Sequence, residues 1–184
     1  MAELRGESVR LRALSREDLP ALRRWLDLPE VGLFVGHQQG PVGLADIERW
    51  FAQVVADESE RAYAIENDAG DLVGYCVVKL TWEHREAHLG AICIDPAAQG
   101  QGYGSDALRS LVRFLFDELG VHRISTGTHA VNEPAIRLCE KIGFVREGTQ
   151  RERWFHAGAW HDAALFGLLR ADFQSKHSYT RGGE

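Results

Sequence analysis

One stretch in the middle of the chain constrains its fold more than any other. Ala87–Ile94 has the apolar pattern of a strand, and Gly100, Gly102 and Gly104 follow it in alternation. Ser105–Leu119 then repeats apolar residues at the i, i+3, i+4 spacing of an amphipathic helix. A strand that enters a long helix through a short glycine loop is typical of proteins that combine helices with a sheet. We therefore expect an α/β protein.

Strand and helix patterns alternate along the rest of the chain. Further strands are expected at Val9–Leu14, Arg61–Glu66, Leu72–Leu80, Val121–Thr128, Phe144–Phe155 and Trp160–Leu169. Further helices are expected at Asp18–Asp27 with Asp18 as N-cap, from Leu44 onward, and from Asn132 to Ile142, whereas Gly32–Gly43 is expected to be irregular. This order predicts one mixed sheet with helices on both faces, in a single domain that spans residues 1–173. The polar residues 174–184 are expected to form a loose tail.

The composition excludes several classes of protein. The chain has 184 residues, of which 45% are hydrophobic and 26% charged, as in a soluble globular domain. A net charge of −6 makes the chain a poor partner for nucleic acid, because such binding depends on contacts between cations and phosphates. No apolar run reaches the roughly 20 residues that a membrane helix needs, and the first residues lack the apolar core of a signal peptide. We expect a cytoplasmic protein without a membrane partner.

The cysteines and histidines indicate neither a disulfide framework nor a metal site. Cys76, Cys93 and Cys139 are an odd number without close pairs, which fits a reducing compartment. His84 and His88 are four residues apart, but the segment between them reads as extended, so the spacing does not place them on one helical face. We expect no bound metal.

The glycine loop favours a phosphate cradle over a merely flexible connection. Glycine has no Cβ and tolerates positive φ, so several backbone N–H groups can converge on one anion beside the positive end of a helix. A P-loop sequence is absent. A dinucleotide fingerprint fails at Ser105, where a third glycine is required, and the next strand ends at His129 without the acidic residue that binds ribose.

The loop resembles the acetyl-CoA loop of the GNAT superfamily of N-acetyltransferases, Q/R-x-x-G-x-G/A, at Gln99, Gly102 and Gly104. The second signature of that family is similar to the segment from Asn132 to Phe144, NEPAIRLCEKIGF. The segments VRLR and DLPAL near the start resemble the branch that acetylates ribosomal proteins and polyamines. The resemblance covers about residues 9–169.

The resemblance implies a splayed sheet and a set of cofactor contacts. The strands that end at Ile94 and at Thr128 separate, and Gly90 is a candidate bulge on the first. Backbone groups of the first strand pair with the pantetheine arm, one N–H polarises the thioester carbonyl, loop amides hold the pyrophosphate, and one side chain reaches the arm. The implied cofactor-binding residues are Ile92, Cys93, Ile94, Gln99, Gly100, Gln101, Gly102, Tyr103, Gly104, Ser105 and Asn132, the last of which equally fits an N-cap.

The implied reaction is direct transfer of acetyl from acetyl-CoA to a primary amine in a ternary complex. His88 stands where polyamine-acetylating relatives carry a glutamate base, and Cys139 stands where many relatives carry a tyrosine acid. An exposed strand histidine and a buried small apolar residue are the alternative roles of these two side chains. Glu83, Glu86 and His129 are further candidates for steering the amine, and Trp82, Trp154 and Trp160 are candidates for lining its pocket.

Three choices stay open at this point. A module that senses acetyl-CoA without catalysis is the alternative to an enzyme, since the usual acid and base residues are replaced. An oxidoreductase that uses a dinucleotide is disfavoured by the missing acidic residue. The acceptor is a polyamine, a protein N-terminus or a small-molecule amine, and a homodimer is compatible with the family, in which dimers are common.

Overall fold

The computed structural model describes residues 4–35, 42–156 and 158–177, and it contains one mixed sheet of eight strands in the order β1-β2-β3-β4-β5-β6-β8-β7. All neighbouring strands are antiparallel except β5 and β6, which are parallel. The strands are β1 (Leu4–Arg5), β2 (Val9–Ala13), β3 (Glu60–Asn67), β4 (Leu72–Thr81), β5 (Glu86–Ile94), β6 (Arg123–His129), β7 (Val145–His156) and β8 (Ala159–Leu169).

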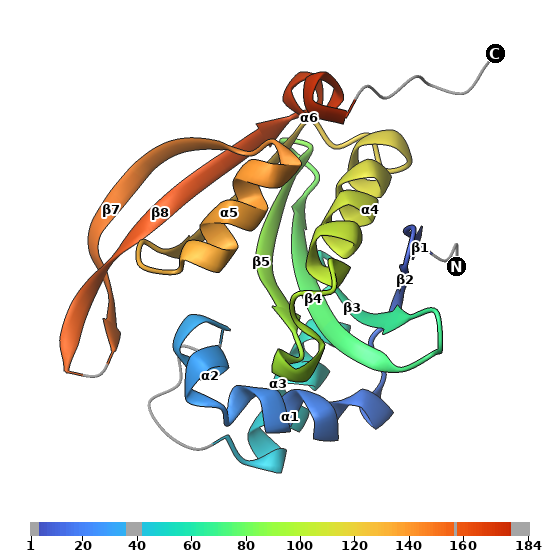
Figure 1. Ribbon diagram of the computed structural model, residues 1–184, viewed down its shortest axis with the longest axis vertical. Coiled ribbons are helices and arrows are strands. Elements are labelled where there is room, and N and C mark those ends of the chain that lie inside the picture. The colour runs from blue at the N-terminus through green and yellow to red at the C-terminus, as the bar shows by residue number, and fades with distance from the viewer. Residues whose placement is uncertain (1–3, 36–41, 157, 178–184) are drawn as a thin grey trace.

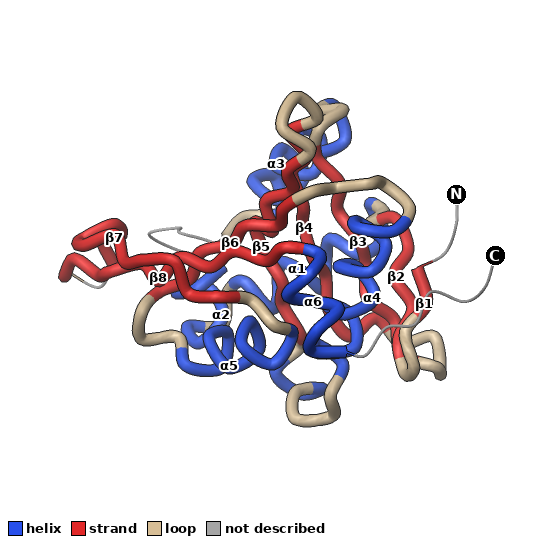
Figure 2. Tube along the Cα trace, turned by 90° about the horizontal axis from the view of Figure 1, so that it is seen from above, coloured by secondary structure: helices blue, strands red, loops and turns tan. Residues whose placement is uncertain are grey.

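Helices cover both faces of this sheet (Figure 1). The helices are α1 (Leu19–Leu26), α2 (Pro29–Val35), α3 (Leu44–Ala56), α4 (Tyr103–Asp117), α5 (Glu133–Ile142) and α6 (Arg170–His177). Seen from above, α4, α5 and α6 lie on one side of the strands, and the ribbon of β7 and β8 extends beyond the body of the sheet (Figure 2). The expected fold class, a mixed α/β domain with helices on both faces, is confirmed.

Two separate apolar cores hold the helices against the sheet. The main core joins α4, α5 and α6 to one face, with Leu111, Phe116 and Phe166 each no more than 1% exposed. The second core joins α1, α2 and α3 to the other face, where Leu22 and Trp25 are buried. Because successive residues of a strand point to opposite faces, each central strand contributes side chains to both cores.

The sheet opens between β5 and β6, as the family resemblance implies. The two strands pair only from Glu86–Arg123 to Leu89–Thr126. Beyond that point β6 pairs with β8 alone, so within the described residues the edge of β5 from Gly90 to Ile94 has no strand beside it. Gly90 is the bulge: Val77 pairs with the residue after it and Val78 with the residue before it. The bulge lies directly at the opening.

The first turn of α4 is tied to the start of the chain by Asp106. Its carboxylate accepts hydrogen bonds from the backbone N–H groups of Glu7 (3.0 Å), Ser8 (2.7 Å) and Val9 (3.1 Å), and from the Ser8 hydroxyl (3.2 Å). Burial alone would raise the pKa of this carboxyl, but the donors outweigh burial, and the pKa lies below its ordinary value. Asp106 is therefore a charged anchor that fixes the helix immediately after the glycine loop.

Two segments that were expected to be irregular contain helices. Pro29–Val35 forms α2 within the segment Gly32–Gly43 and just before it, and Val31 is buried in the second core; residues 36–41 lie outside the described residues. The helix α6 covers the beginning of the expected tail, where Phe173 packs against Phe116 with ring centroids 6.1 Å apart; residues 178–184 are not described. Both helices are short, so tertiary burial rather than local pattern stabilises them.

Asp18 is the N-cap residue of α1, as expected, but its side chain has another role. Its carboxylate makes no capping bond to α1 and instead accepts from the backbone N–H of Ser15 at 2.8 Å and from both terminal nitrogens of Arg12. Arg12 also donates to Glu66 at 2.7 Å, and both carboxylates are buried. The VRLR and DLPAL segments therefore meet in a buried ion-pair network that joins β2, β3 and the start of α1.

Candidate functional site

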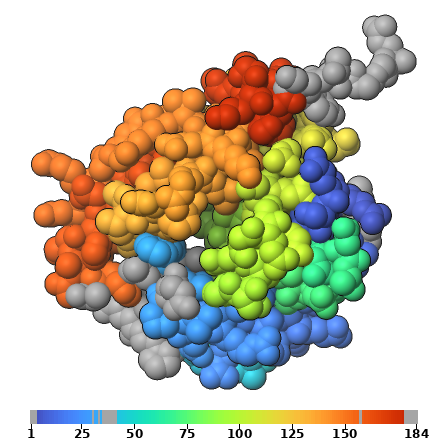
Figure 3. All heavy atoms as spheres, in the orientation of Figure 1, coloured from blue at the N-terminus to red at the C-terminus, as the bar shows by residue number. Residues whose placement is uncertain are grey.

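A groove of about 610 Å³ opens where α2, α4 and α5 meet the unpaired end of β5. Figure 3 shows the surface hollowed at this place. All the expected cofactor-binding residues except Gln101 line it: Ile92, Cys93, Ile94, Gln99, Gly100, Gly102, Tyr103, Gly104, Ser105 and Asn132. The structure thus brings together side chains and backbone from two distant signatures, the glycine loop and the segment that begins α5.

The glycine loop has the geometry of an anion cradle. Gly100 and Gly102 have φ of +80° and +86°, and a Cβ built at either position meets no atom within 4 Å. Gly102 is the N-cap of α4, so the first N–H groups of this 15-residue helix have no partner within the helix and point toward the loop. These amides and the positive end of the helix favour a phosphate group. The residues present therefore fit the pyrophosphate of acetyl-CoA.

Gln99 and Asn132 hold the two edges of the groove in place. The Gln99 side chain donates to the carbonyl of Ile94 at 3.2 Å, which ties the loop to the end of β5. The Asn132 side chain accepts from the backbone N–H of Ala135 at 3.2 Å and so caps α5, as expected. Its carbonyl oxygen is thereby occupied, and its amide NH₂ group is left to act as a donor.

One face of α5 completes the groove with residues that were not singled out from the sequence. Pro134, Leu138 and Lys141 line it, together with Phe34 from α2. The spacing of the first three, i, i+4 and i+7, places them on one side of a helix, so the helical period of the second signature could have identified them. Lys141 adds a positive charge to a site that suits phosphate.

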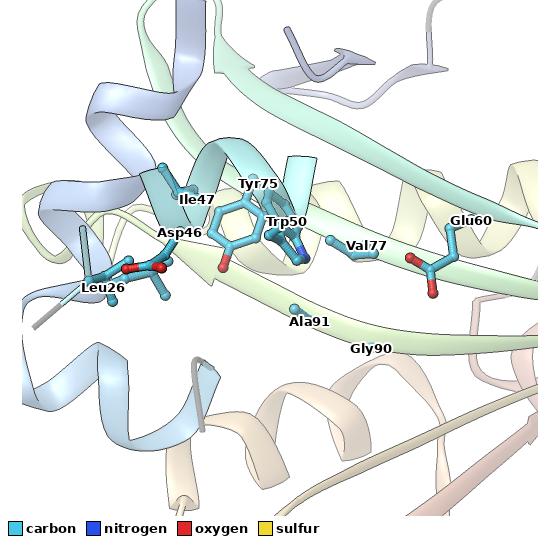
Figure 4. A pocket seen from close by; sticks show the side chains of 10 residues that line it. Leu26, Asp46, Ile47, Trp50, Glu60, Tyr75, Val77, Gly90 and Ala91 are labelled. Atoms are coloured by element: carbon cyan, nitrogen blue, oxygen red, sulfur yellow. The ribbon is translucent and has the colours of Figure 1, made fainter. Parts of the chain in front are cut away.

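A second pocket of about 260 Å³ lies on the α1 and α3 side of the same strand. Gly90 and Ala91 of β5 line it, whereas the groove begins at Ile92. Figure 4 shows the carboxylates of Asp46 and Glu60 at opposite ends of this pocket, with the rings of Trp50 and Tyr75 between them. The second pocket and the groove are therefore lined by consecutive residues of β5, beginning at the bulge where the sheet opens.

His88 lies on the same face of β5 as the second pocket but does not line it. Ala87 and Leu89 are buried in the main core, so the residue between them points to the opposite face. The Nδ1 atom of His88 lies 3.2 Å from the Ser125 hydroxyl. Desolvation lowers the pKa of His88 from its ordinary value of 6.5, and the charge of Glu86 opposes this only in part. At neutral pH the imidazole is therefore uncharged and able to accept a proton.

Cys139 lies in the main core, 6% exposed, and is not among the residues that line the groove. Burial raises the pKa of its thiol to about 12. The neighbouring Leu138 does line the groove, because a step of one residue turns a helix by about 100°. A catalytic role for this thiol is not shown, and it remains a prediction.

The other candidates for contacting the amine do not border the second pocket. Trp82 and Trp160 are 50% and 60% exposed, at the β4–β5 turn and near the tip of the β7–β8 ribbon. Glu86 lies 3.5 Å from Arg123. His129 is buried at the end of β6 and stacks on Trp154, with centroids 4.4 Å apart. The carboxylates and aromatic rings that do line the pocket come from α3, β3 and β4.

Neither a metal site nor a membrane span is found in the part of the chain that the structure describes. No three His, Cys, Asp or Glu side chains there are placed to hold an ion together. No helix within the same ranges is long and apolar enough to cross a membrane.

Comparison with known sequences places the chain among acetyltransferases. Residues 8–145 match the acetyltransferase (GNAT) domain family. The chain is 27% identical to the SPbeta prophage-derived uncharacterized N-acetyltransferase YokL of Bacillus subtilis, over 94% of this chain and 96% of that protein. It is 34% identical to aminoglycoside N(6′)-acetyltransferase type 1 of Klebsiella pneumoniae, over 78% of this chain and 77% of that protein.

Comparison of the fold with solved structures also relates the chain to acetyltransferases. The structure of spermidine N-acetyltransferase from Vibrio cholerae in complex with CoA and spermine superposes with a TM-score of 0.82 at 25% identity, and the match covers 90% of this chain and 97% of that chain. The splayed strands, the glycine loop at the start of α4 and the match over residues 8–145 agree with one another. The chain belongs to the GNAT family and is an N-acetyltransferase that uses acetyl-CoA to acetylate an amine.

Proposed function

We propose that the second pocket binds the acceptor, and that the acceptor is a small organic amine with at least two positive charges. The observation that carries this proposal is a carboxylate at each end of the pocket, Asp46 and Glu60, with aromatic rings between them (Figure 4). Ammonium groups form charge-assisted hydrogen bonds with carboxylates, and aromatic faces attract cations. Relatives named for spermidine and for aminoglycosides support the same class of acceptor.

The two sites border consecutive residues of β5, so that the reacting ends of their ligands can meet at the opening of the sheet. Acetyl-CoA supplies a reactive thioester, and the groove receives it along Ile92–Ile94. An amine in the second pocket lies on the other side of the same strand, next to Gly90 and Ala91. Transfer forms the bond between nitrogen and the acetyl carbon and breaks the bond between that carbon and sulfur; the amine gives up a proton, and the leaving thiolate gains one. Water is not needed as a reactant, so a ternary complex is sufficient.

Each part of the groove has a separate role in this proposal. The backbone amides from Gln99 to Ser105, that of Gln101 included, hold the pyrophosphate, and Lys141 adds charge. The free edge of β5 from Ile92 to Ile94 pairs with the amides of the pantetheine arm, and one N–H group of that edge polarises the thioester carbonyl. The amide of Asn132 donates to the same arm. The cytoplasmic location and the homodimer stay predictions.

His88 is the proposed base that accepts the amine proton, directly or through a water molecule. Because its pKa lies below 6.5, kcat/KM for the acceptor should fall in a limb below pH 6.5, where the imidazole becomes charged. We expect His88→Gln to lower kcat/KM at pH 7 and to remove this limb. The kcat/KM of the wild type, divided by that of the variant, should therefore fall toward one as the pH is lowered. The ionisation of the acceptor itself is the same for both enzymes and cancels in the ratio.

His84→Gln provides the control for this measurement. His84 is exposed in the turn before β5, four residues away, and its loss should change neither the rate at pH 7 nor the limb. Acetyl-CoA affinity should be unchanged in both variants. A pH profile of His88→Gln that runs parallel to the wild type would remove His88 from the mechanism.

A comparison of 1,7-diaminoheptane with 1-aminoheptane tests the proposed acceptor class. The two amines share the same seven-carbon chain and differ only in the second amino group, which carries the second charge. We expect kcat/KM to be at least about tenfold higher for the diamine, which corresponds to about 1.4 kcal/mol of binding to the second carboxylate. Glu60→Gln should reduce this preference, because it removes the charge at one end of the pocket.

Asp57→Asn is the matched control for Glu60→Gln. Both carboxylates bond the Nζ atom of Lys79, at 3.2 Å for Asp57 and 3.3 Å for Glu60, but only Glu60 lines the pocket. The two variants therefore change the net charge and the lysine contact alike. Equal rates for the diamine and the monoamine, or an equal loss of preference in both variants, would contradict the proposed acceptor site.

A further inference from the structure

Tyr75 places a polar group in the middle of the proposed acceptor pocket. The side chain comes from β4 and is only 3% exposed. Its ring lies parallel to that of Trp25, at a centroid distance of 6.5 Å, and meets that of Trp50 edge to face at 6.2 Å. These two contacts fix the direction of the ring. Figure 4 shows the hydroxyl group pointing away from the helix α3 and toward the strand β5, at a place between the two carboxylates.

The hydroxyl of Tyr75 makes no hydrogen bond to any residue that the structure describes. The hydroxyl oxygen is not among the fully buried polar atoms that lack a partner, so it is open to the pocket that Tyr75 lines, and a ligand there can bond it in place of water. Burial also raises the pKa of Tyr75, so the group is protonated and neutral at neutral pH. It is therefore available both to donate and to accept one hydrogen bond within the pocket.

We infer that Tyr75 is a specificity-determining residue, whose hydroxyl binds a nitrogen in the middle of the acceptor chain. This inference rests on the proposed acceptor site. If the two ends of an acceptor lie at Asp46 and Glu60, the part of its chain between the ends lies beside the hydroxyl group. A secondary ammonium group there donates to the hydroxyl oxygen and lies against the electron-rich rings of Trp50 and Tyr75. A methylene group at the same place leaves the hydroxyl unsatisfied.

The structure thus predicts a preference between two chains of equal length. Bis(3-aminopropyl)amine and 1,7-diaminoheptane both have seven atoms between their terminal nitrogens, and they differ only in the central atom, NH in the first and CH₂ in the second. A site built to hydrogen-bond a polar group discriminates against the analogue that lacks it. We expect kcat/KM to be about tenfold higher for the triamine, the fold-change that corresponds to about 1.4 kcal/mol.

Tyr75→Phe should abolish this preference while keeping the ring contacts with Trp25 and Trp50. The ratio of kcat/KM for the two amines should fall to about one, because triamine activity drops and activity on 1,7-diaminoheptane is kept. Tyr63→Phe is the matched control. Tyr63 is a buried tyrosine on the adjacent strand β3, but it packs into the main core on the opposite face, so its loss should leave the ratio unchanged.

The ratio of rates separates this inference from the proposed function. If the wild type acetylates both amines equally, or if Tyr75→Phe keeps the wild-type ratio, Tyr75 does not select the acceptor, although the proposed pocket stands. If neither amine is acetylated, the proposed acceptor class and the role of Tyr75 are both overturned. The ratio of kcat/KM for the two amines can be measured with the wild type alone. The inference can therefore be tested even if Tyr75→Phe does not fold.

Discussion

Replacing Gly102 with valine is expected to weaken the binding of acetyl-CoA at least tenfold. Gly102 is the N-cap of α4 with φ of +86°, and a Cβ built there meets no protein atom within 4 Å. Gly102 lines the groove, so we expect the branched side chain to take space beside the loop amides that would hold the pyrophosphate. A tenfold loss corresponds to about 1.4 kcal/mol, which the loss of even one charge-assisted contact to the pyrophosphate would supply.

Gly70→Val separates this steric effect from backbone strain. Gly70 also has φ of +86° with no atom within 4 Å of a built Cβ, but it lies in the turn between β3 and β4. Holding a valine at positive φ costs on the order of 1–3 kcal/mol at either position. Both variants should therefore lower Tm similarly, whereas calorimetric titration should show weaker acetyl-CoA binding for Gly102→Val alone. Wild-type affinity in a folded Gly102→Val variant would remove the loop from the cofactor site.

The parts of the site that could be predicted from the sequence are those with local causes. Gly102 and Gly143 both adopt positive φ, and Asn132 caps the helix that follows it; each is a conformation that the residue itself favours. Such signals fix the loop before α4 and both ends of α5 to within one or two residues. Because the two signatures lie on neighbouring elements, they predict the part of the proposed cofactor groove that the glycine loop and the start of α5 form.

The proposed acceptor pocket could not be predicted in this way, because no local sequence pattern marks it. Trp50 comes from α3, Glu60 from β3 and Tyr75 from β4, and only the order of the strands brings them together. The tryptophans expected from the sequence to line the acceptor site, Trp82, Trp154 and Trp160, do not line this pocket, and the structure leaves Trp82 and Trp160 exposed. Tertiary contact, rather than residue type, distinguishes the two sets.

The short helices α2 and α6 could not be predicted from the sequence for the same reason as the pocket, because tertiary contacts determine them. Each has eight residues or fewer, a length at which a helix in isolation is unstable. Their apolar residues, such as Val31 and Phe173, stabilise them only after the sheet has formed the two cores. The location of α2 matters for function, since Phe34 lines the cofactor groove. One wall of the groove therefore depends on a helix that the local sequence pattern does not predict.

Cys139→Ala is the second change for which a large effect is predicted. The proposal that this thiol protonates the leaving CoA thiolate predicts a ten- to hundredfold lower kcat, the range typical of general acid catalysis, with an unchanged KM for acetyl-CoA. Two features of the structure, the burial of Cys139 and the pKa of its thiol, bear on this prediction. Cys139 is buried in the main core, and the pKa of about 12 keeps the thiol protonated but makes it a weaker acid than an ordinary thiol near 8.5.

Cys76→Ala is the control that decides between catalysis and packing. Cys76 is also a free cysteine in the main core, its pKa is likewise raised to about 12 by burial, and it lies on β4, where it pairs with Ile92 but does not itself line the groove. Loss of a buried thiol should lower the stability of both variants by about 1 kcal/mol, seen as a lower Tm. A large fall in kcat for Cys139→Ala alone assigns the proton to this residue. If kcat stays at the wild-type value while Tm falls in both variants, Cys139 packs the core, and the proton on the leaving thiolate comes from solvent.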